Sequence, residues 1–406
     1  MSFADKTLAN STTSARSSFN ALARANQSAW IAFGEVITKD DDKVPLSTKA
    51  SYQEVLSGEI LINPLNLNYD LKSLRIALFK IDVVVSAGYI VIKEKRDINK
   101  EYFKYLLHRY DVVNMKLLGS GVRQTINFNH IANSLLILPP NHEQSSIANF
   151  LDQKTAQIDE AITIKEKQIA LLKERKQIII QKAVTQGLNP NVPMKDSGVE
   201  WIGQIPAHWT VSKIGHYARV YNGSTPSRDV GRYWEKGTIP WMSSGKVNDY
   251  KITTPSELVS EAAIRECSLR LFPKGTVLVG IVGQGKTRGT SAILEIDAVI
   301  NQNVAGIIPS NKLSSLFLHQ YLIQAYDEVR NQGQGSNQEA LNCQILSAFK
   351  IAFPPLNEQK AIVEFISDQA NTIDQTIEIQ QSQIHKLKEY KSTLIDSAVT
   401  GKVKVA

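Results

Sequence analysis

The feature that most constrains this fold is a long internal repeat with a constant offset of 215 residues. Positions 136–185 align with positions 351–400 without a gap. The same offset extends back into the preceding globular sequence, so the chain is a tandem duplication of a larger unit. Each copy consists of a globular half followed by a long segment. Matched positions include Pro139-Pro140 with Pro354-Pro355, Glu143-Gln144 with Glu358-Gln359, and Ile81-Asp82 with Ile296-Asp297.

Each long segment is predicted to be one helix, over 141–187 in the first copy and 356–402 in the second. Apolar residues recur at spacings of three, four or seven with Lys, Glu and Gln between them, which is the pattern of a narrow coiled-coil seam. Pro-Pro precedes each helix and a glycine lies near each end. The stripe comprises Leu151, Ile158, Ile162, Ile169, Leu172, Ile179 and Ala183 in the first copy, and Ile366, Ile373, Ile377, Ile384, Leu387, Leu394 and Ala398 in the second.

An amphipathic helix of this length must bury its stripe. One interpretation is a coiled coil that dimerises two molecules. We favour antiparallel pairing of the two helices within the chain, because each helix follows a similar globular half and the pair would hold the halves at a fixed distance. The helices then act as a spacer of roughly 60 Å.

The globular halves are predicted to be mixed α/β domains, over 28–140 and 201–355. In the second half the strands are TVLVGIV, SAILEI and AVINQNVAGIIP, and in the first they are EILINP and DVVVSAGYIVI; a helical stretch follows in each. A linker over 188–200 joins the copies, and the polar segment 1–27 stays unassigned. The expected fold class is α+β, with two tandem mixed α/β domains separated by two long antiparallel coiled-coil helices in a pseudo-two-fold internal repeat.

The composition predicts a soluble protein with an anionic partner. The chain has 43% hydrophobic and 21% charged residues, and no apolar run approaches the roughly 18 residues of a membrane span. Its first residues lack the apolar block of an export signal, so we expect a cytoplasmic location without membrane contact. The net charge of +7 favours an anionic partner, of which nucleic acid is the commonest.

The stretch GIVGQGKT, residues 280–287, fits the phosphate-binding pattern G-x-x-x-x-G-K-S/T. A nucleotide-binding loop of this kind needs a strand before it and a helix directly after it, whose N-terminus faces the phosphates. The strand is predicted, but the residues after Thr287 carry a β pattern, and the matching region of the first copy, 58–70, contains no GKT. A P-loop NTPase with coiled-coil arms is therefore the alternative function. We favour a chance match within a glycine loop.

These features together resemble the specificity subunits of type I restriction-modification enzymes. The resemblance rests on the duplicated PP-x-x-EQ motif that opens each long helix, on DSGVEWIGQIPAHWTV at 196–211, and on the strand VINQNVAGIIP. It extends from Trp30 to the C-terminus, although the first half has no counterpart of DSGVEWIGQIP. The resemblance implies two target-recognition domains that read a bipartite, asymmetric site in double-stranded DNA, with the helix pair fixing the unread gap.

The resemblance also implies that the chemistry belongs to partner subunits. Two modification subunits would use S-adenosylmethionine for adenine methylation, and restriction subunits would use ATP and Mg²⁺ for DNA cleavage. The chain itself is expected to be non-catalytic and to hold no cofactor or metal. Its Pro-Pro pairs do not fit the D/N/S-P-P-aromatic loop of amino-methyltransferases, and its seven histidines lack metal-ligand spacing. The residues expected to dock partner subunits are Glu143, Gln144, Glu358 and Gln359.

Basic and amide side chains in Gly-rich loops are the candidates for DNA contact. Lys and Arg can neutralise phosphate or donate to guanine, and Gln can bond adenine through both amide atoms. The stretch 221–247 carries such residues among aromatic ones, and an ordinary solvated surface is the alternative interpretation. The candidates are Arg228, Arg232, Lys246, Gln284, Lys286, Thr287 and Arg288 in the second half, and Asn68, Tyr69, Tyr89, Arg123 and Gln124 in the first.

Overall fold

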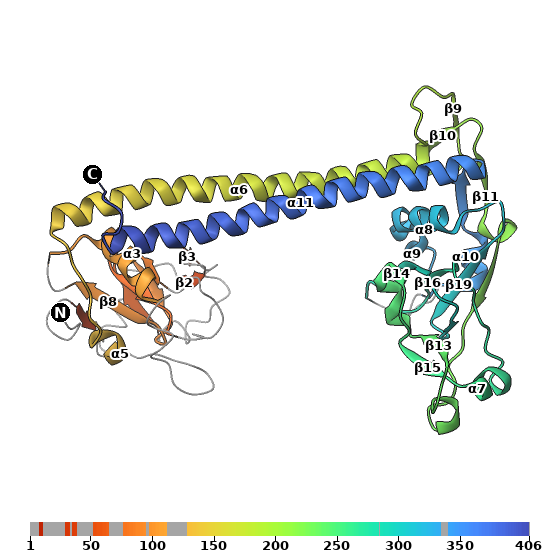
Figure 1. Cartoon of the computed structure of the whole chain (residues 1–406), viewed down its shortest axis with the longest axis horizontal. Coiled ribbons are helices and arrows are strands. Elements are labelled where there is room, and N and C mark those ends of the chain that lie inside the picture. The colour runs from red at the N-terminus through yellow and green to blue at the C-terminus, as the bar shows by residue number, and fades with distance from the viewer. Residues whose placement is uncertain are drawn as a thin grey trace. The chain divides into compact units, whose positions relative to one another are not determined.

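The computed structural model describes residues 8–10, 29–32, 35–38, 52–64, 76–94, 97–111, 128–283, 285–333 and 340–405. The chain divides into two compact units, each with helices and sheets (Figure 1). Unit 1 comprises Met1–Lys167 and Gln380–Ala406, and unit 2 comprises Gln168–Ile379. Two long helices, α6 (Asn141–Gln186) and α11 (Leu356–Val399), each contribute residues to both units. Among the helices in these ranges, none is long and apolar enough to cross a membrane.

Unit 1 is built on an antiparallel sheet with the strand order β1-β8-β5-β6. Its strands are β1 (Leu8–Asn10), β5 (Ile60–Ile62), β6 (Ile76–Leu78) and β8 (Ile90–Glu94). Two further strand pairs are β2 (Ala29–Ala32) with β3 (Glu35–Thr38), and β4 (Gln53–Val55) with β7 (Val83–Val85). The shorter helices are α3 (Lys100–Tyr110) and α5 (Phe128–Ala132). Every residue of β5 and β7 is buried, which explains their wholly apolar composition.

Unit 2 contains a five-stranded sheet of order β12-β19-β16-β17-β14 and a three-stranded sheet of order β15-β13-β18. The first has β12 (Ala218–Asn222), β14 (Lys251–Ile252), β16 (Val277–Gly280), β17 (Ser291–Leu294) and β19 (Val304–Pro309), and the second has β13 (Ile239–Met242), β15 (Glu257–Val259) and β18 (Val299–Ile300). Strand pairs are β9 (Met194–Asp196) with β10 (Gln204–Pro206), and β11 (Thr210–Lys213) with β20 (Lys350–Phe353). The shorter helices are α7 (Glu261–Glu266), α8 (Ser315–Gln324), α9 (Tyr326–Asn331), α10 (Cys343–Ala348), and the 3-10 helices η4 (Ile214–His216), η5 (Gly231–Tyr233) and η6 (Ser244–Asp249).

The segment DSGVEWIGQIPAHW anchors unit 2 through its two tryptophans. Trp209 is 1% exposed and meets Phe317 edge-on, with ring centroids 6.3 Å apart. Trp201 stacks on Phe349 with ring centroids 5.7 Å apart. Large aromatic side chains bury much apolar surface each, so this segment is part of the core of unit 2.

The two units share an element order at the offset of 215 residues. Strands β5, β6 and β8 and helix α3 of unit 1 fall on β16, β17 and β19 and helix α8 of unit 2. The strand order β8-β5-β6 matches β19-β16-β17, and all four pairings are antiparallel. The strands predicted from TVLVGIV, SAILEI and EILINP are confirmed by β16, β17 and β5.

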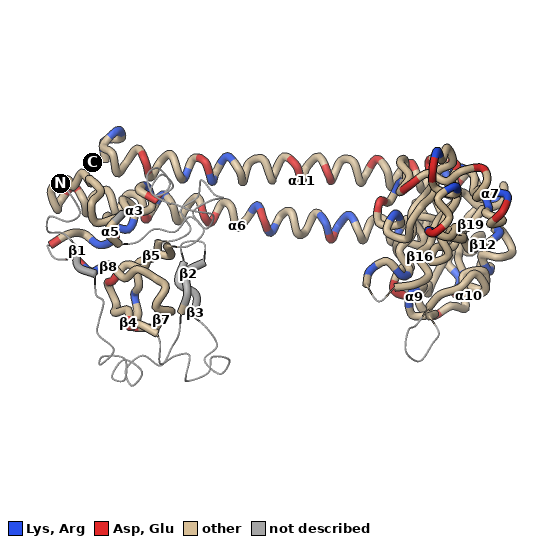
Figure 2. The backbone as a smooth tube through the Cα atoms, turned by 90° about the horizontal axis from the view of Figure 1, so that it is seen from below, with Lys and Arg blue, Asp and Glu red and all other residues tan. Residues whose placement is uncertain are grey.

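Helices α6 and α11 pack together within each unit, and acidic and basic residues are interspersed along both (Figure 2). In unit 1, Lys391 donates to Asp159 at 2.6 Å and Lys165 donates to Gln383 at 2.5 Å. The two helices therefore run in opposite directions within this unit. Such exposed polar contacts contribute little each, and the buried apolar stripe is the main stabilising contact. Its buried members are Leu151, Ile158, Ile162, Ile169 and Ala183 on α6, and Ile366, Ile373, Ile377, Ile384, Leu394 and Ala398 on α11.

The glutamine of each PP-x-x-EQ motif is buried and ties its long helix to the globular part of the same unit. Gln144 accepts a hydrogen bond from the N–H of Asn99 at 3.0 Å and donates to the Pro139 carbonyl at 2.8 Å. Asn99 is the N-cap of α3. Because a helix N-terminus leaves N–H groups without intrahelical partners, the glutamine side chain completes the capping of α3.

The second motif makes the same connection in unit 2. Gln359 accepts from the N–H of Ser314, the N-cap of α8, at 2.7 Å. Its amide nitrogen donates to the carbonyls of Pro354 at 2.8 Å and Lys312 at 3.0 Å. The side chain is 0% exposed, so these three bonds replace all contact with water.

Candidate functional site

The loop with the phosphate-binding pattern lies within a β-hairpin. Strands β16 and β17 pair antiparallel, with Val279 opposite Ser291. The N–H of Gly280 donates to the Thr290 carbonyl at 3.0 Å, and the N–H of Gly289 donates to the Gly280 carbonyl at 2.9 Å. A strand follows this loop, as the sequence predicts, whereas a P-loop requires a helix whose N-terminus faces the phosphates.

Two glycines of this loop are required by the hairpin geometry. A Cβ atom on Gly280 would lie 2.3 Å from the carbonyl oxygen of Thr287, so a side chain at this position would force the loop apart. Gly289 has a φ of +86°, in the left-handed region that favours glycine. The first glycine of the pattern therefore has a structural role that involves no phosphate.

Three chain connections of unit 2 start or end at the same end of the five-stranded sheet. Strands β12 and β16 both pair antiparallel with β19, and their last residues, Asn222 and Gly280, lie opposite Ala305 and Val304. Strand β14 runs parallel to β17, so η6, which precedes β14, lies where β17 begins. The connection after β12, the loop between β16 and β17, and η6 are thus brought together by the sheet.

Arg228 and Arg232, in the connection after β12, form ion pairs. Arg228 donates to both carboxylate oxygens of Glu257, at 2.6 and 2.7 Å, and its guanidinium carbon lies 3.6 Å from the centroid of the Trp234 ring. The hydrogen bonds from Arg228 hold the pKa of Glu257 below its usual range. Arg232 donates to Glu266 at 2.5 Å. A phosphate would have to compete with these carboxylates for either guanidinium.

Lys246 and Lys286 come from the other two connections. Lys246 lies in η6 and donates to Asp249 at 2.7 Å. Lys286 is exposed in the loop between β16 and β17, where Thr287 is half-buried and Arg288 is buried. Lys286 is therefore the basic side chain of the described part of this loop with most access to a ligand.

In unit 1 the equivalent end of the sheet holds Tyr89. This residue directly precedes β8, where Ile90 lies opposite Ile62, the last residue of β5. Gln53 donates to the Tyr89 carbonyl at 2.8 Å, and the half-buried ring packs against the core. The other candidates of this half, Asn68, Tyr69, Arg123 and Gln124, lie outside the described residues, as does Gln284 in unit 2.

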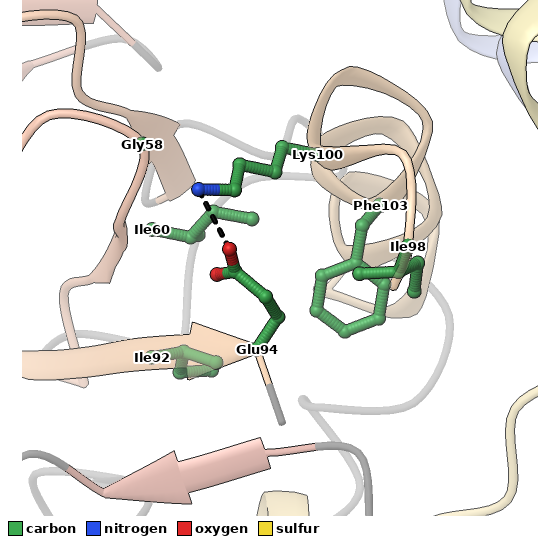
Figure 3. A pocket seen from close by; sticks show the side chains of 7 residues that line it. All are labelled: Gly58, Ile60, Ile92, Glu94, Ile98, Lys100 and Phe103. Atoms are coloured by element: carbon green, nitrogen blue, oxygen red, sulfur yellow. Dashed lines mark ion pairs between the residues drawn. The ribbon is translucent and has the colours of Figure 1, made fainter. Parts of the chain in front are cut away.

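A small hollow lies at the opposite end of the unit 1 sheet (Figure 3). Lys100 at the start of α3 forms an ion pair with Glu94 at 2.7 Å across it. Apolar side chains surround this pair, namely Ile60, Ile92, Ile98 and Phe103. Because the charges neutralise each other and lie at the end of the sheet away from Tyr89, this hollow is not included in the candidate site.

The four motif residues predicted to dock partner subunits differ in their surroundings. Gln144 and Gln359 are buried and bonded within the chain, as described above. Glu358 accepts from the indole N–H of Trp209 at 3.1 Å and pairs with His208 at 2.8 Å, whereas Glu143 is exposed. Their docking role stays a prediction.

Sequence reasoning did not single out three residues that the fold brings to this end of unit 2. Arg270 lies with its guanidinium carbon 3.8 Å from the centroid of the Tyr221 ring. Tyr326 and Arg330, on α9, bond to the backbone of the loop between β16 and β17. No local pattern marks these contacts, because they join residues 40 or more positions apart.

Comparisons with known proteins agree on one family. A family model described as the type I restriction modification DNA specificity domain matches residues 62–174 and 206–389. The type I restriction enzyme MjaIX specificity subunit of Methanocaldococcus jannaschii is 33% identical over 172 residues, which cover 41% of this chain and 39% of that relative. The putative MjaX specificity subunit of the same organism is 25% identical over 387 residues, which cover 91% of this chain and 86% of that relative. A chain from a solved structure on the assembly and conformational transition of a type I R-M system has a TM-score of 0.69 at 15% identity, covering 98% of this chain and 96% of that one, which shows a shared fold.

Proposed function

Because the chain belongs to the family of type I restriction modification DNA specificity domains, we propose that it selects the DNA sequence on which a type I restriction-modification complex acts. The main support is the end of the five-stranded sheet in unit 2, where the three connections that carry Arg228, Lys246 and Lys286 start or end. Basic side chains on neighbouring loops suit a phosphate backbone, and adjacent polar groups can read base edges.

Within this surface we assign Lys286 to DNA phosphate, because its side chain is exposed. Arg228, Arg232 and Lys246 would contact DNA by exchanging their carboxylate partners for phosphate. Thr287, Arg288 and Gln284 complete the candidate loop. In unit 1 the corresponding surface would comprise Asn68, Tyr69, Tyr89, Arg123 and Gln124.

The matching element order of the two units supports a bipartite recognition site. Each unit would read one part, and the two parts would differ because the loop sequences differ. We propose that α6 and α11 form an antiparallel coiled coil with pseudo-two-fold symmetry, so that a fixed number of base pairs separates the two parts. The buried stripe on both helices is the observation behind this spacer.

We assign the chemistry to partner subunits. Two modification subunits would methylate adenine with S-adenosylmethionine, and restriction subunits would cleave DNA with ATP and Mg²⁺. Of the four motif residues, the exposed Glu143 has the surroundings that best suit contact with a partner. The glutamines would support docking by holding the long helices in place.

The complex of the full chain with its modification subunits is expected to methylate adenines within a single bipartite sequence. Genomic DNA lacking such methylation would serve as substrate, and sequencing would map the modified adenines. The modification subunits alone form the control and should leave the DNA unmodified. Methylation of the same positions without this chain would contradict the proposed function.

Substitution Lys286→Ala separates DNA recognition from the P-loop alternative. Removing one phosphate contact is expected to weaken DNA binding and to lower the slope of log K against log salt by about 1. Titrations of duplex DNA by fluorescence anisotropy at several salt concentrations would measure both. Lys312→Ala, an equal charge change at the opposite end of the same sheet, is the matched control. If the wild-type chain binds ATP and Lys286→Ala abolishes that binding, the P-loop alternative is correct.

A further inference from the structure

Helix α9 binds the backbone of the loop between β16 and β17 through two side chains. Arg330 Nη1 lies 2.8 Å from the Gly285 carbonyl and 3.0 Å from the Arg288 carbonyl. The hydroxyl of Tyr326 donates to the Lys286 carbonyl at 3.1 Å and lies 3.2 Å from Arg330 Nη1. Three carbonyls of one short loop are thus held by one helix.

The helix that makes these bonds is itself fixed in the core. Val329 is 1% exposed, and Ala325, which separates α8 from α9, is 0% exposed. Gly289 packs directly against α9, since a Cβ atom there would lie 3.3 Å from Arg330 Cβ and 3.4 Å from the Tyr326 carbonyl oxygen. The loop therefore contacts a rigid support along its backbone, while Lys286 keeps its side chain exposed.

We propose that Arg330 and Tyr326 are positioning residues for sequence recognition, which hold the loop between β16 and β17 in the conformation that reads DNA. This inference rests on the proposed function and assigns a role to residues that need not touch DNA. A loop held in its bound conformation loses less conformational entropy on binding, which favours the DNA site that fits that conformation. Non-specific binding depends on phosphate neutralisation and needs no single loop conformation.

The positioning role makes Arg330 different from a residue that only stabilises the fold. General destabilisation of unit 2 would reduce specific and non-specific DNA binding together. Loss of loop positioning would reduce the preference for the selected sequence and leave binding to unrelated DNA intact. The ratio of the two affinities is therefore the decisive quantity.

The test uses the full chain in complex with its modification subunits. A pool of duplexes with randomised positions is first selected for binding to the wild-type complex, and an enriched duplex and its scrambled counterpart become the probes. Arg330→Ala is expected to lower affinity for the enriched duplex by about tenfold or more, with unchanged affinity and salt dependence for the scrambled one. Tyr326→Phe, which removes only a hydroxyl, is expected to shift the ratio in the same direction by a smaller factor.

Two further variants complete the design. Arg330→Lys keeps the charge but replaces the rigid planar guanidinium, whose Nη1 bonds two carbonyls, with a flexible ammonium, so an intermediate ratio is expected. Arg265→Ala is the control for charge, because Arg265 is exposed on α7 and pairs with Glu261. An unchanged ratio in both Arg330→Ala and Tyr326→Phe would overturn the positioning role. If the wild-type complex enriches no sequence, the proposed function itself fails.

Discussion

Replacing Gln359 with leucine is expected to lower the free energy of unfolding of unit 2 by about 3 kcal/mol. The substitution keeps the volume of the side chain but removes the partner of the Ser314 N–H and of two carbonyls, those of Pro354 and Lys312. Gln359 is 0% exposed, so no bulk water contacts its side chain. Each buried polar group left without a partner costs about 1–3 kcal/mol.

Hydrogen exchange measured by mass spectrometry would locate this effect, and urea unfolding would quantify it. The amides at the start of α8 are expected to exchange faster in the variant, because the N-cap Ser314 loses its tie to α11. The matched control is Gln375→Leu, at an exposed position of the same helix. Equal stability and equal exchange in the two variants would show that the buried glutamine does not connect α11 to α8.

Lowering the pH from 7 to 4 is expected to remove about 3 kcal/mol of unit 2 stability through His319 alone. Burial lowers the pKa of His319 to about 4, and the nearby charge of Lys251 acts in the same direction. The ring is 0% exposed, with Nδ1 3.1 Å from the Ser291 hydroxyl and its centroid 4.7 Å from that of Tyr250. The unfolded chain takes up the proton near pH 6.5, whereas the folded chain does so only near pH 4, so stability falls as the pH drops between these values.

His319→Gln removes the titrating ring while an amide can still bond Ser291. The variant is expected to lose less stability than the wild type between pH 7 and pH 4, as measured by urea unfolding at each pH. His216→Gln, at an exposed position of the same unit, is the matched control for the substitution itself. Identical pH profiles for His319→Gln and the wild type would contradict neutral burial of His319.

The helices and strands of this fold can be predicted from the sequence, because their hydrophobic periodicity depends only on residues that are near one another in the chain. Most residues of the apolar stripe on α6 and α11 are buried, and the apolar runs mark strands β5, β16 and β17. The phosphate-binding pattern could be set aside because a β pattern follows it. The need for Gly280, by contrast, comes from the close approach of the Thr287 carbonyl, which no spacing rule reveals.

The residues that hold the candidate site together are harder to predict, since their bonds join distant parts of the sequence. Gln144 and Gln359 stand out in the sequence as motif residues, but their bonds to Asn99 and Ser314 span 45 positions. Arg330 belongs to an ordinary amphipathic stretch, and only the packing of α9 beside the hairpin brings it to Gly285 and Arg288. The hydrophobic periodicity of the sequence thus identifies buried residues, whereas the hydrogen bonds between polar side chains depend on the tertiary fold.

The division of both long helices between the two units has a consequence for how such chains can recombine. Crossovers near Lys167 and Gln380 would keep together the bonds described here, including those of Gln144 with Asn99 and Gln359 with Ser314. Crossovers at the Pro-Pro pairs would separate each glutamine from the helix that it caps. Functional chimeras of related chains are therefore expected to have their junctions in the middle of the long helices. Exchange of a whole unit at these junctions would pair the DNA half-site preferences of two different parent chains.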